Sequence, residues 1–326
     1  MRKEKQLDKK SIVTRSYRGD LFAEFKKSAR SLQGMAIYGN YAFLFYHGAS
    51  CDVMDLCAKE VIANFHAASY TGDGKGPKIN HANQTVFSNA FYEPDDLFPL
   101  LYITAGNSGE ADEEGYYGRC MVERILMETD ENGQKKFSSE LVETIIFNDN
   151  HWSADDNRYY TAEAASEFER PCWGWPAFFP DWENNRLYLF SSRYRTNGRS
   201  RAYDAKNAYI ITAFPLPDPR KSGDVVKLYP NDILNQFSTE YDAEVTQGGT
   251  LYNGRIYYTF GFGREDFPDK IRVFDLSERR IVAKLELQDS IFANEEIESC
   301  QVHKGMLLCN TKSGRIYNLG PVADME

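Results

Sequence analysis

The chain has 326 residues, a formal net charge of −10 at pH 7, and 21 Tyr and 21 Phe residues. Because an acidic chain repels phosphate backbones, we expect no nucleic acid among its partners. No apolar run reaches the roughly 18 residues of a membrane-spanning helix, and the charged N-terminus lacks the apolar stretch of a secretory signal. We therefore expect a cytoplasmic protein as the sequence is written, or a secreted or periplasmic one if its N-terminus was trimmed.

An internal repeat is the strongest pattern along the chain. The segment Gln33–Phe43 matches Gln247–Tyr257, since each contains an apolar run, a pair of Gly and Asn residues, and a second apolar run. Further on, Val53–Leu56 matches Val273–Leu276, and the second copy has six additional residues that fit the loop Arg264–Asp269. Gly-Asn and Asn-Gly pairs supply the positive φ that two-residue hairpins need. Each copy therefore predicts four antiparallel strands.

Three further copies follow the same alternation of apolar runs and turns. One extends over His81–Asn148, and the next over Trp173–Leu228, with Val225–Leu228 as its fourth strand. The last begins near Glu298 and has only three strands of its own. Pairing the first and last segments of the chain would remove its open edge, and Ser11–Arg15 is the segment that we expect to supply the fourth strand.

Four-stranded repeats of about 40–50 residues are typical of β-propeller blades. The sequence therefore predicts an all-β protein with a single domain over residues 1–326, a β-propeller of five blades with four antiparallel strands each, the last blade closed by an N-terminal strand. We expect residues 1–10 to form a disordered tail and residues 149–172 to form a long loop between blades. A sixth blade would have to lie within that loop.

A binding site is expected where the innermost strands begin, because their first residues converge on one mouth of the central channel. In three copies the blade start is found by counting seven positions back from the hairpin turn, whereas the second and third copies are less regular. The residues predicted to bind a ligand are Gln33, His81, Asn83, Trp175, Gln247 and Glu298, with Trp173 as an alternative to Trp175.

This ring of amides, one imidazole, one indole and one carboxylate favours a small polar molecule, such as a sugar or the end of a peptide. Aromatic faces are suited to stacking on a sugar ring. A competing interpretation is that the amides only satisfy backbone groups or ordered water, and that Trp173 and Trp175 pack inside a blade. We expect no cofactor and no metal, since the five His residues lack the spacing of a metal site. We also expect a monomer.

The segment Thr246–Gly261 resembles the plant and bacterial type of glutaminyl-peptide cyclotransferase. Thr246–Gly248 and Tyr257–Gly261 match its motif, and Ile271–Leu276 matches its next strand. The resemblance implies a five-bladed propeller and a cyclotransferase site. However, Tyr258 occupies the position of the family's catalytic Glu, and a phenol with a pKa near 10 cannot replace a carboxylate that moves protons near neutral pH. The chain also resembles uncharacterised secreted propellers of gut bacteria.

Whether the protein is an enzyme is left open by the sequence. The alternative hypothesis is a hydrolase or transferase, of the glycosidase or cyclotransferase type, that uses Glu298 as its catalytic residue. Glycosidases need two carboxylates about 5–10 Å apart, and Glu295, Glu296 and Asp242 are the nearest candidates. A site in which Glu298 stands alone would rule this hypothesis out. A third hypothesis is a platform for protein interactions on the outer loops.

Overall fold

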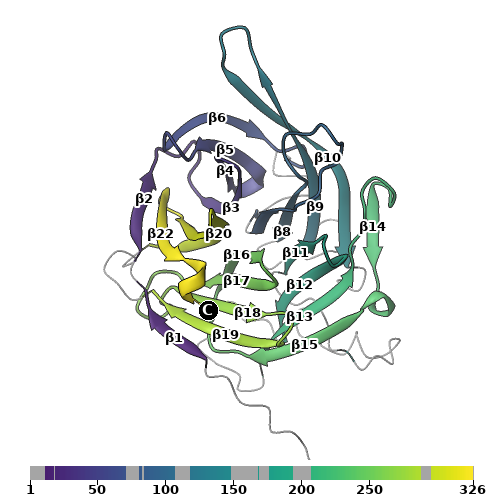
Figure 1. Ribbon diagram of the computed structural model, residues 1–326, viewed down its shortest axis with the longest axis vertical. Coiled ribbons are helices and arrows are strands. Elements are labelled where there is room, and N and C mark those ends of the chain that lie inside the picture. Colours follow the sequence, from purple (N-terminus) through teal and green to yellow (C-terminus); the bar gives the residue numbers. More distant parts are fainter. Residues whose placement is uncertain are drawn as a thin grey trace, which may run out of the picture.

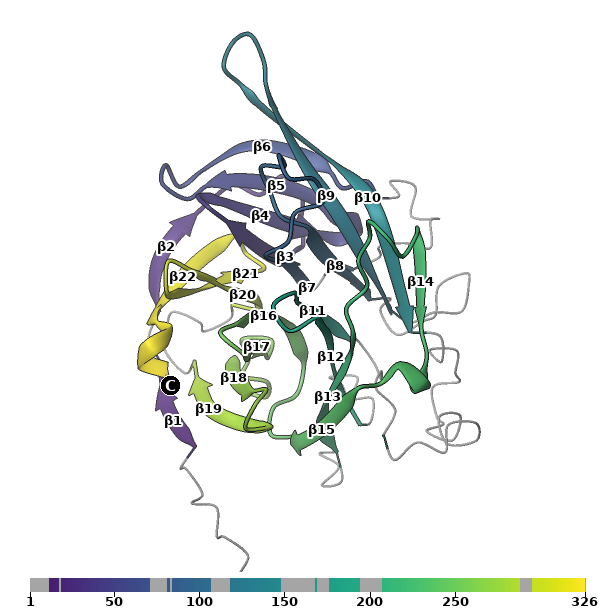
Figure 2. The same ribbon diagram turned by 45° about the vertical axis from the view of Figure 1, so that its right-hand side comes forward.

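The computed structural model describes residues 12–17, 19–70, 81–82, 84–106, 118–147, 168, 176–193, 207–287 and 295–325. Within these ranges the strands form five sheets that surround a common centre (Figure 1). A view turned by 45° shows the same sheets as the blades of a ring (Figure 2). The prediction of an all-β propeller with five blades is therefore confirmed.

Blades one to four each contain four strands in the order of the chain, and the first of these strands is the innermost. Blade one contains β3 (Leu32–Tyr38), β4 (Tyr41–Tyr46), β5 (Ser50–Asp55) and β6 (Glu60–His66). Blade two contains β7 (Gln84–Phe87), β8 (Leu101–Gly106), β9 (Gly118–Thr129) and β10 (Lys135–Phe147). Blade three contains β11 (Ala177–Asp181), β12 (Arg186–Ser192), β13 (Ala208–Pro215) and β15 (Asn235–Glu240). Blade four contains β16 (Thr246–Tyr252), β17 (Arg255–Phe260), β18 (Lys270–Asp275) and β19 (Arg280–Glu286).

Blade five combines both ends of the chain. It contains β20 (Ile297–His303), β21 (Met306–Thr311) and β22 (Arg315–Pro321), and β2 (Asp20–Glu24) pairs with β22 as its outermost strand. Closure by an N-terminal strand is thus confirmed, but the expectation that Ser11–Arg15 supplies it was wrong. Instead, β1 (Val13–Ser16) runs parallel to β19 at the edge of blade four. Val13 packs there against the hydrophobic cluster between blades four and five, which a local sequence pattern does not reveal.

The burial of the strands follows their distance from the axis. The inner strand β3 is buried at five successive positions, whereas the outer strand β19 alternates buried and half-buried residues. This is the expected difference between a strand covered on both faces and one covered on a single face. Five hydrophobic clusters fill the spaces between neighbouring blades. The core of the molecule is therefore a ring of blade-to-blade contacts.

The outer edge of blade three differs from the prediction. Val225–Leu228 forms β14, which pairs in parallel with β10 of blade two, and β15 is the fourth strand of blade three. The prediction was wrong because Val226 and Leu228 pack into the cluster between blades two and three, where β14 extends the neighbouring sheet. Thr144 N donates a hydrogen bond to Asp224 O at 2.8 Å just before β14 begins.

Strands β9 and β10 are longer than the apolar runs in the sequence indicated. They have 12 and 13 residues, and Figure 1 shows their hairpin projecting beyond the ring. Phe137 of this hairpin makes edge contacts with Tyr41 and Phe43 of blade one, at centroid distances of 5.9 and 5.8 Å. The polar residues of the hairpin thus extend the two strands, because Ile125, Phe137 and Leu141 pack into the hydrophobic cluster shared with blade one.

Candidate functional site

Three predicted residues lie where inner strands begin. Gln33, Gln247 and Glu298 are each the second residue of β3, β16 and β20, and all three are buried. Gln33 Nε2 donates to Glu298 Oε1 at 3.4 Å, so the starts of blades one and five meet directly. We call this end of the inner strands the mouth.

The amide of Gln247 reaches another carboxylate of the segment that leads into β20. Gln247 Nε2 donates to Gly261 O at 2.9 Å and to Glu296 Oε1 at 3.4 Å. The other carboxylate oxygen of Glu296 accepts a hydrogen bond from Lys312 Nζ at 2.6 Å. Glu298 is therefore not alone at the mouth, because a second carboxylate with a different environment lies two residues away.

Burial dominates the electrostatics of Glu298. The side chain is 2% exposed, and desolvation raises its pKa well above the usual range for a carboxyl group. The negative charges of Glu296 and Asp269 raise the pKa further, and the positive charges of Lys312 and Lys27 only partly oppose them. Because burial disfavours the charged form, it favours the protonated form of Glu298.

Asp269 adds a second buried carboxyl to this region. It is 1% exposed, and burial raises its pKa to about 8, with the charges of Glu296 and Glu295 contributing. Asp269 Oδ1 accepts a hydrogen bond from Gly263 N at 2.8 Å, while Oδ2 has no partner among the described residues. Gly263 has a φ of 63°, and a Cβ there would lie 1.8 Å from Glu295 O. Only glycine allows the loop between β17 and β18 to approach blade five so closely.

His81 lies near the same mouth, at the approach to β7. Its ring is 4.1 Å from that of His47, measured between centroids, in an edge-to-face arrangement. Burial, together with the positive charges of His47 and Lys312, lowers the pKa of His81 to about 3. His81 is therefore neutral at physiological pH. The other two predicted residues, Asn83 and Trp175, lie outside the described residues, as does Trp173.

Deeper along the inner strands, amides satisfy backbone groups across the axis. Gln84 Nε2 donates to Gly249 O at 2.8 Å, and Gln84 Oε1 accepts from Gly249 N at 2.6 Å. Gln301 Nε2 donates to Thr85 O at 3.0 Å. These bonds join blades two, four and five, so the interpretation that axial amides are structural applies to this layer. Gln84 was not among the predicted residues. It begins β7 but lies level with Gly249, which is two positions further along its strand than Gln247.

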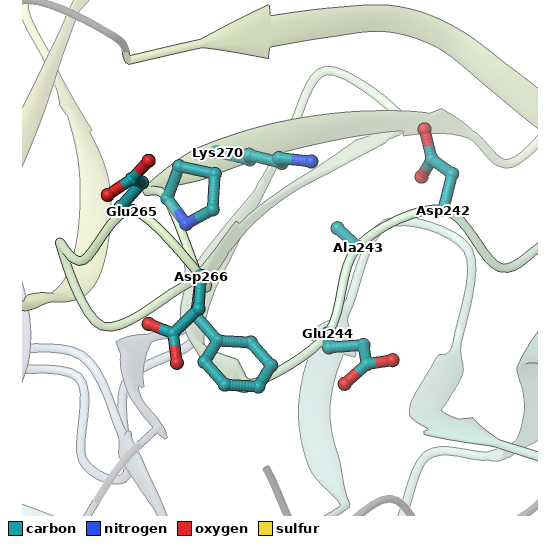
Figure 3. A pocket seen from close by; sticks show the side chains of 8 residues that line it. Asp242, Ala243, Glu244, Glu265, Asp266 and Lys270 are labelled. Atoms are coloured by element: carbon teal, nitrogen blue, oxygen red, sulfur yellow. The ribbon is translucent and has the colours of Figure 1, made fainter. Parts of the chain in front are cut away.

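A cavity of about 770 Å³ adjoins the mouth on the side of blade four. Figure 3 shows Lys270 extending toward the side where Asp242 lies, with Glu244, Glu265 and Asp266 around the rest of the wall. Asp242 already pairs with Arg272 at 3.0 Å and Lys284 at 2.9 Å, and Asp266 pairs with Arg264 at 3.3 Å. Much of the acidic charge in this wall is therefore neutralised by the protein itself.

Tyr258, at the position that corresponds to the catalytic Glu of the cyclotransferases, is a core residue. It is 1% exposed, its ring stacks on Phe190 at 4.3 Å, and its hydroxyl donates to Gln247 O at 2.9 Å. Burial raises the pKa of this phenol further above 10. Tyr258 therefore supports the backbone at the start of blade four and does not exchange protons near neutral pH.

Asp269, Lys312 and Lys27 are parts of the mouth that were not predicted from the sequence. All three lie in or beside connections between strands, whose course depends on tertiary packing. One feature of the sequence could have indicated Asp269: it is the last residue of the six-residue insertion Arg264–Asp269 in the second copy of the repeat. Within the described ranges, no group of three or more His, Cys, Asp or Glu residues is arranged to hold a metal ion, and no helix is long and apolar enough to cross a membrane.

No protein-family model and no curated protein matches this chain. Among solved structures it is similar to a glutaminyl cyclase from Myxococcus xanthus, at 11% identity and a TM-score of 0.47, over 94% of this chain and 97% of that one. It is also similar to Raptor from Chaetomium thermophilum (14% identity, TM-score 0.37, 93% of this chain and 21% of that one). A third structure is the computationally designed Ika8 protein (8% identity, TM-score 0.36, 93% and 100%). At these scores, arguments about function rest on the residues of the site itself.

Proposed function

We propose that the chain binds a small polar molecule, a sugar or the end of a peptide, at the mouth where β3, β16 and β20 begin. The supporting observation is Glu298, a carboxyl group that is 2% exposed and accepts a hydrogen bond from Gln33 at 3.4 Å. A buried polar group with unused hydrogen-bonding capacity lowers the stability of a fold. A ligand that bonds to Glu298 would offset this cost.

The polar atoms at the mouth indicate what such a ligand must offer. Protonated Glu298 can donate an O–H, and Gln33 Oε1, which has no partner in the described part of the chain, can accept one hydrogen bond or two. Lys312 and Lys27 supply positive charge close to Glu298. Hydroxyl, amide and carboxylate groups fit this combination, and all three occur in sugars, sugar acids and peptide ends.

Isothermal titration calorimetry with a panel of monosaccharides, disaccharides, sugar acids, amino acids and dipeptides tests the proposal. We expect saturable binding of one class, weakened by about tenfold or more in Gln33→Leu, since one hydrogen bond is worth about 1–1.5 kcal/mol. Glu143→Gln is the matched control, because Glu143 is a buried carboxyl of raised pKa that lies in the outer part of blade two. Absence of binding across the panel, or equal binding by Gln33→Leu, would overturn the proposal.

A second candidate function, acid–base catalysis, is favoured by the two carboxyl groups of the segment entering β20. Glu298 is buried, and burial raises its pKa, whereas Glu296 is ion-paired with Lys312 at 2.6 Å. Two carboxyl groups with different environments can divide the roles of general acid and ionised carboxylate. On this hypothesis Glu298 is the proton donor.

The Glu298→Gln variant separates binding from catalysis. A glutamine keeps the size of a protonated glutamate and a hydrogen-bond donor, so binding should change by less than about threefold. It cannot transfer a proton, so hydrolysis of unactivated disaccharides, whose alcohol leaving group must be protonated, or ammonia release from glutaminyl peptides, should fall to background. Turnover that survives in Glu298→Gln would exclude this residue as the acid, and wild-type protein without turnover on either substrate class would leave binding as the function.

A further inference from the structure

Two cysteines of blade five face each other across neighbouring strands. Cys300 of β20 is directly opposite Cys309 of β21, and both are completely buried. The other cysteines that lie within described strands have different neighbours, because Cys51 is opposite Phe45 and Phe65, and Cys120 is opposite Thr104 and Ile145. Among the described cysteines, only Cys300 and Cys309 form a cross-strand pair.

The hairpin turn fixes the type of this pair. Lys304 and Gly305 form a two-residue turn with positive φ values of 50° and 77°, so the flanking residues His303 and Met306 form a hydrogen-bonded pair. Pairs alternate along an antiparallel ladder, which makes the pair three positions further out a non-hydrogen-bonded one. Opposite residues at such a site have Cα atoms about 4.5 Å apart, within the range of about 4.4–6.8 Å that a disulfide spans.

The corresponding places in other blades are filled differently. They hold Met35 opposite Leu44 in blade one, and Gly249 opposite Tyr258 in blade four. The position therefore accepts several apolar combinations, and packing alone does not require two sulfur atoms in blade five. The Cys300 thiol lies close enough to influence its neighbour, since burial and Cys300 both raise the pKa of Cys309.

We propose that Cys300 and Cys309 form a cross-strand disulfide when the chain folds in the presence of a disulfide oxidant such as oxidised glutathione. One cysteine thiolate attacks the oxidant and displaces one glutathione thiolate. The other cysteine thiolate then attacks the mixed disulfide and displaces the second glutathione. Two protein thiols are thereby oxidised to one disulfide, one oxidised glutathione is reduced to two glutathione molecules, and the two protons pass to these.

Burial determines when this reaction takes place. In the folded chain Cys300 Sγ contacts Tyr257 O of blade four at 3.4 Å, and burial raises the pKa of Cys309 well above its usual value. Because the thiolate is the attacking species, a thiol in this environment reacts slowly. The disulfide therefore forms while the hairpin is still open to solvent, before blade four covers it. It then fixes β20, the strand that carries Glu298, to β21.

Peptide mapping after refolding tests the proposal, because trypsin cleaves after Lys304 in the turn between the two cysteines. The full chain carrying Cys57→Ser, which removes the exposed thiol, is reduced in denaturant and refolded with glutathione buffer or with reductant alone. After oxidative refolding and alkylation we expect peptides 285–304 and 305–312 to be linked, with a mass about 2 Da below their sum. Reduction should separate them.

Controls distinguish this pair from random oxidation. Cys51→Ala should leave the linked peptides unchanged, Cys300→Ser should abolish them, and folded reduced protein given the same oxidant should yield at least tenfold less of them. Separate alkylated peptides after oxidative refolding, or links to other cysteines, would overturn the proposal. If the chain does not refold from denaturant, the same mapping on protein expressed in an oxidising compartment gives the same two outcomes.

Discussion

Two buried carboxyl groups, one in blade two and one in blade five, have opposite environments. Glu123 of β9 is 0% exposed and accepts hydrogen bonds from Ala68 N at 3.1 Å, Ser69 N at 3.0 Å, and the hydroxyls of Ser69 and Ser139. Glu298 of β20 is 2% exposed, and the bond that the structure describes to its carboxyl is one of 3.4 Å from Gln33.

The difference separates a structural carboxylate from a candidate functional one. Backbone and hydroxyl donors replace water around Glu123, so its negative charge is stabilised inside the protein. They also tie the chain after β6 to the hairpin of blade two. Glu298 has no comparable set of donors among the described residues, and burial without them raises its pKa. A fold keeps such a group at a cost in stability, which is common at functional sites.

Removing Glu123 should have the largest effect on stability. In Glu123→Ala the amides of Ala68 and Ser69 and two hydroxyls lose their acceptor inside the fold, so we expect the free energy of unfolding to fall by about 4 kcal/mol. Urea denaturation at pH 7 measures the change. Glu131→Ala, in the exposed turn of the same hairpin, is the control and should change stability by less than about 0.5 kcal/mol. Equal effects of the two variants would refute the structural role of Glu123.

Asp269 should contribute a measurable pH dependence of stability at the mouth. Its pKa of about 8 in the folded chain exceeds the value of about 4 in the unfolded chain, so the folded state binds more protons in between. The stability that the protonated group contributes is complete below about pH 4 and is lost as the pH rises to about 8. Asp269→Asn keeps the acceptor for Gly263 N and removes this loss.

The test is the free energy of unfolding of wild type and Asp269→Asn, measured from pH 4 to pH 8.5. We expect the wild type to lose about 3 kcal/mol more than the variant over this range, since relaxation around the carboxyl reduces the full electrostatic cost. Parallel curves for the two proteins would show that Asp269 does not change its protonation in this range.

The sequence predicted the blades because their signals are local. The match between Gln33–Phe43 and Gln247–Tyr257 depends on hairpin turns and adjacent apolar runs, and both copies form those hairpins. It did not predict the partners of β1 and β14, because these short strands lie at sheet edges. Their positions depend on the packing of Val13 and Val226 against apolar residues from other parts of the chain.

The candidate site could be predicted in part for the same reason. Gln33, Gln247 and Glu298 follow from the register of the repeat, and the structure brings Gln33 and Glu298 into contact. Their role in binding stays a prediction. Asp269 and Lys312 could not be derived, because connections of different length bring them to the mouth. The raised pKa of Glu298 likewise depends on burial by several blades, which no single segment encodes.

Glu143 sharpens the comparison because it is intermediate between Glu123 and Glu298. Its Oε2 accepts a hydrogen bond from Ser222 Oγ at 2.5 Å, while Oε1 has no partner among the described residues. Burial raises its pKa to about 7, so the stability from its protonated form is present below about pH 4.5 and is lost as the pH rises to about 7.

Glu143→Gln, which keeps an acceptor for Ser222, should therefore gain about 2 kcal/mol relative to wild type between pH 4.5 and pH 7.5, the smallest of the three effects. Urea denaturation at the two pH values measures it, and Glu143→Gln combined with Asp269→Asn should show the sum of both gains, since the groups lie in different blades. A Glu143 variant that loses stability as steeply as the wild type would mean that the hydroxyl of Ser222 alone suffices to stabilise this carboxylate. One strong hydrogen bond would then stabilise a buried carboxylate as well as the four donors around Glu123 do. The small number of donors around Glu298 would no longer mark it as a candidate functional residue.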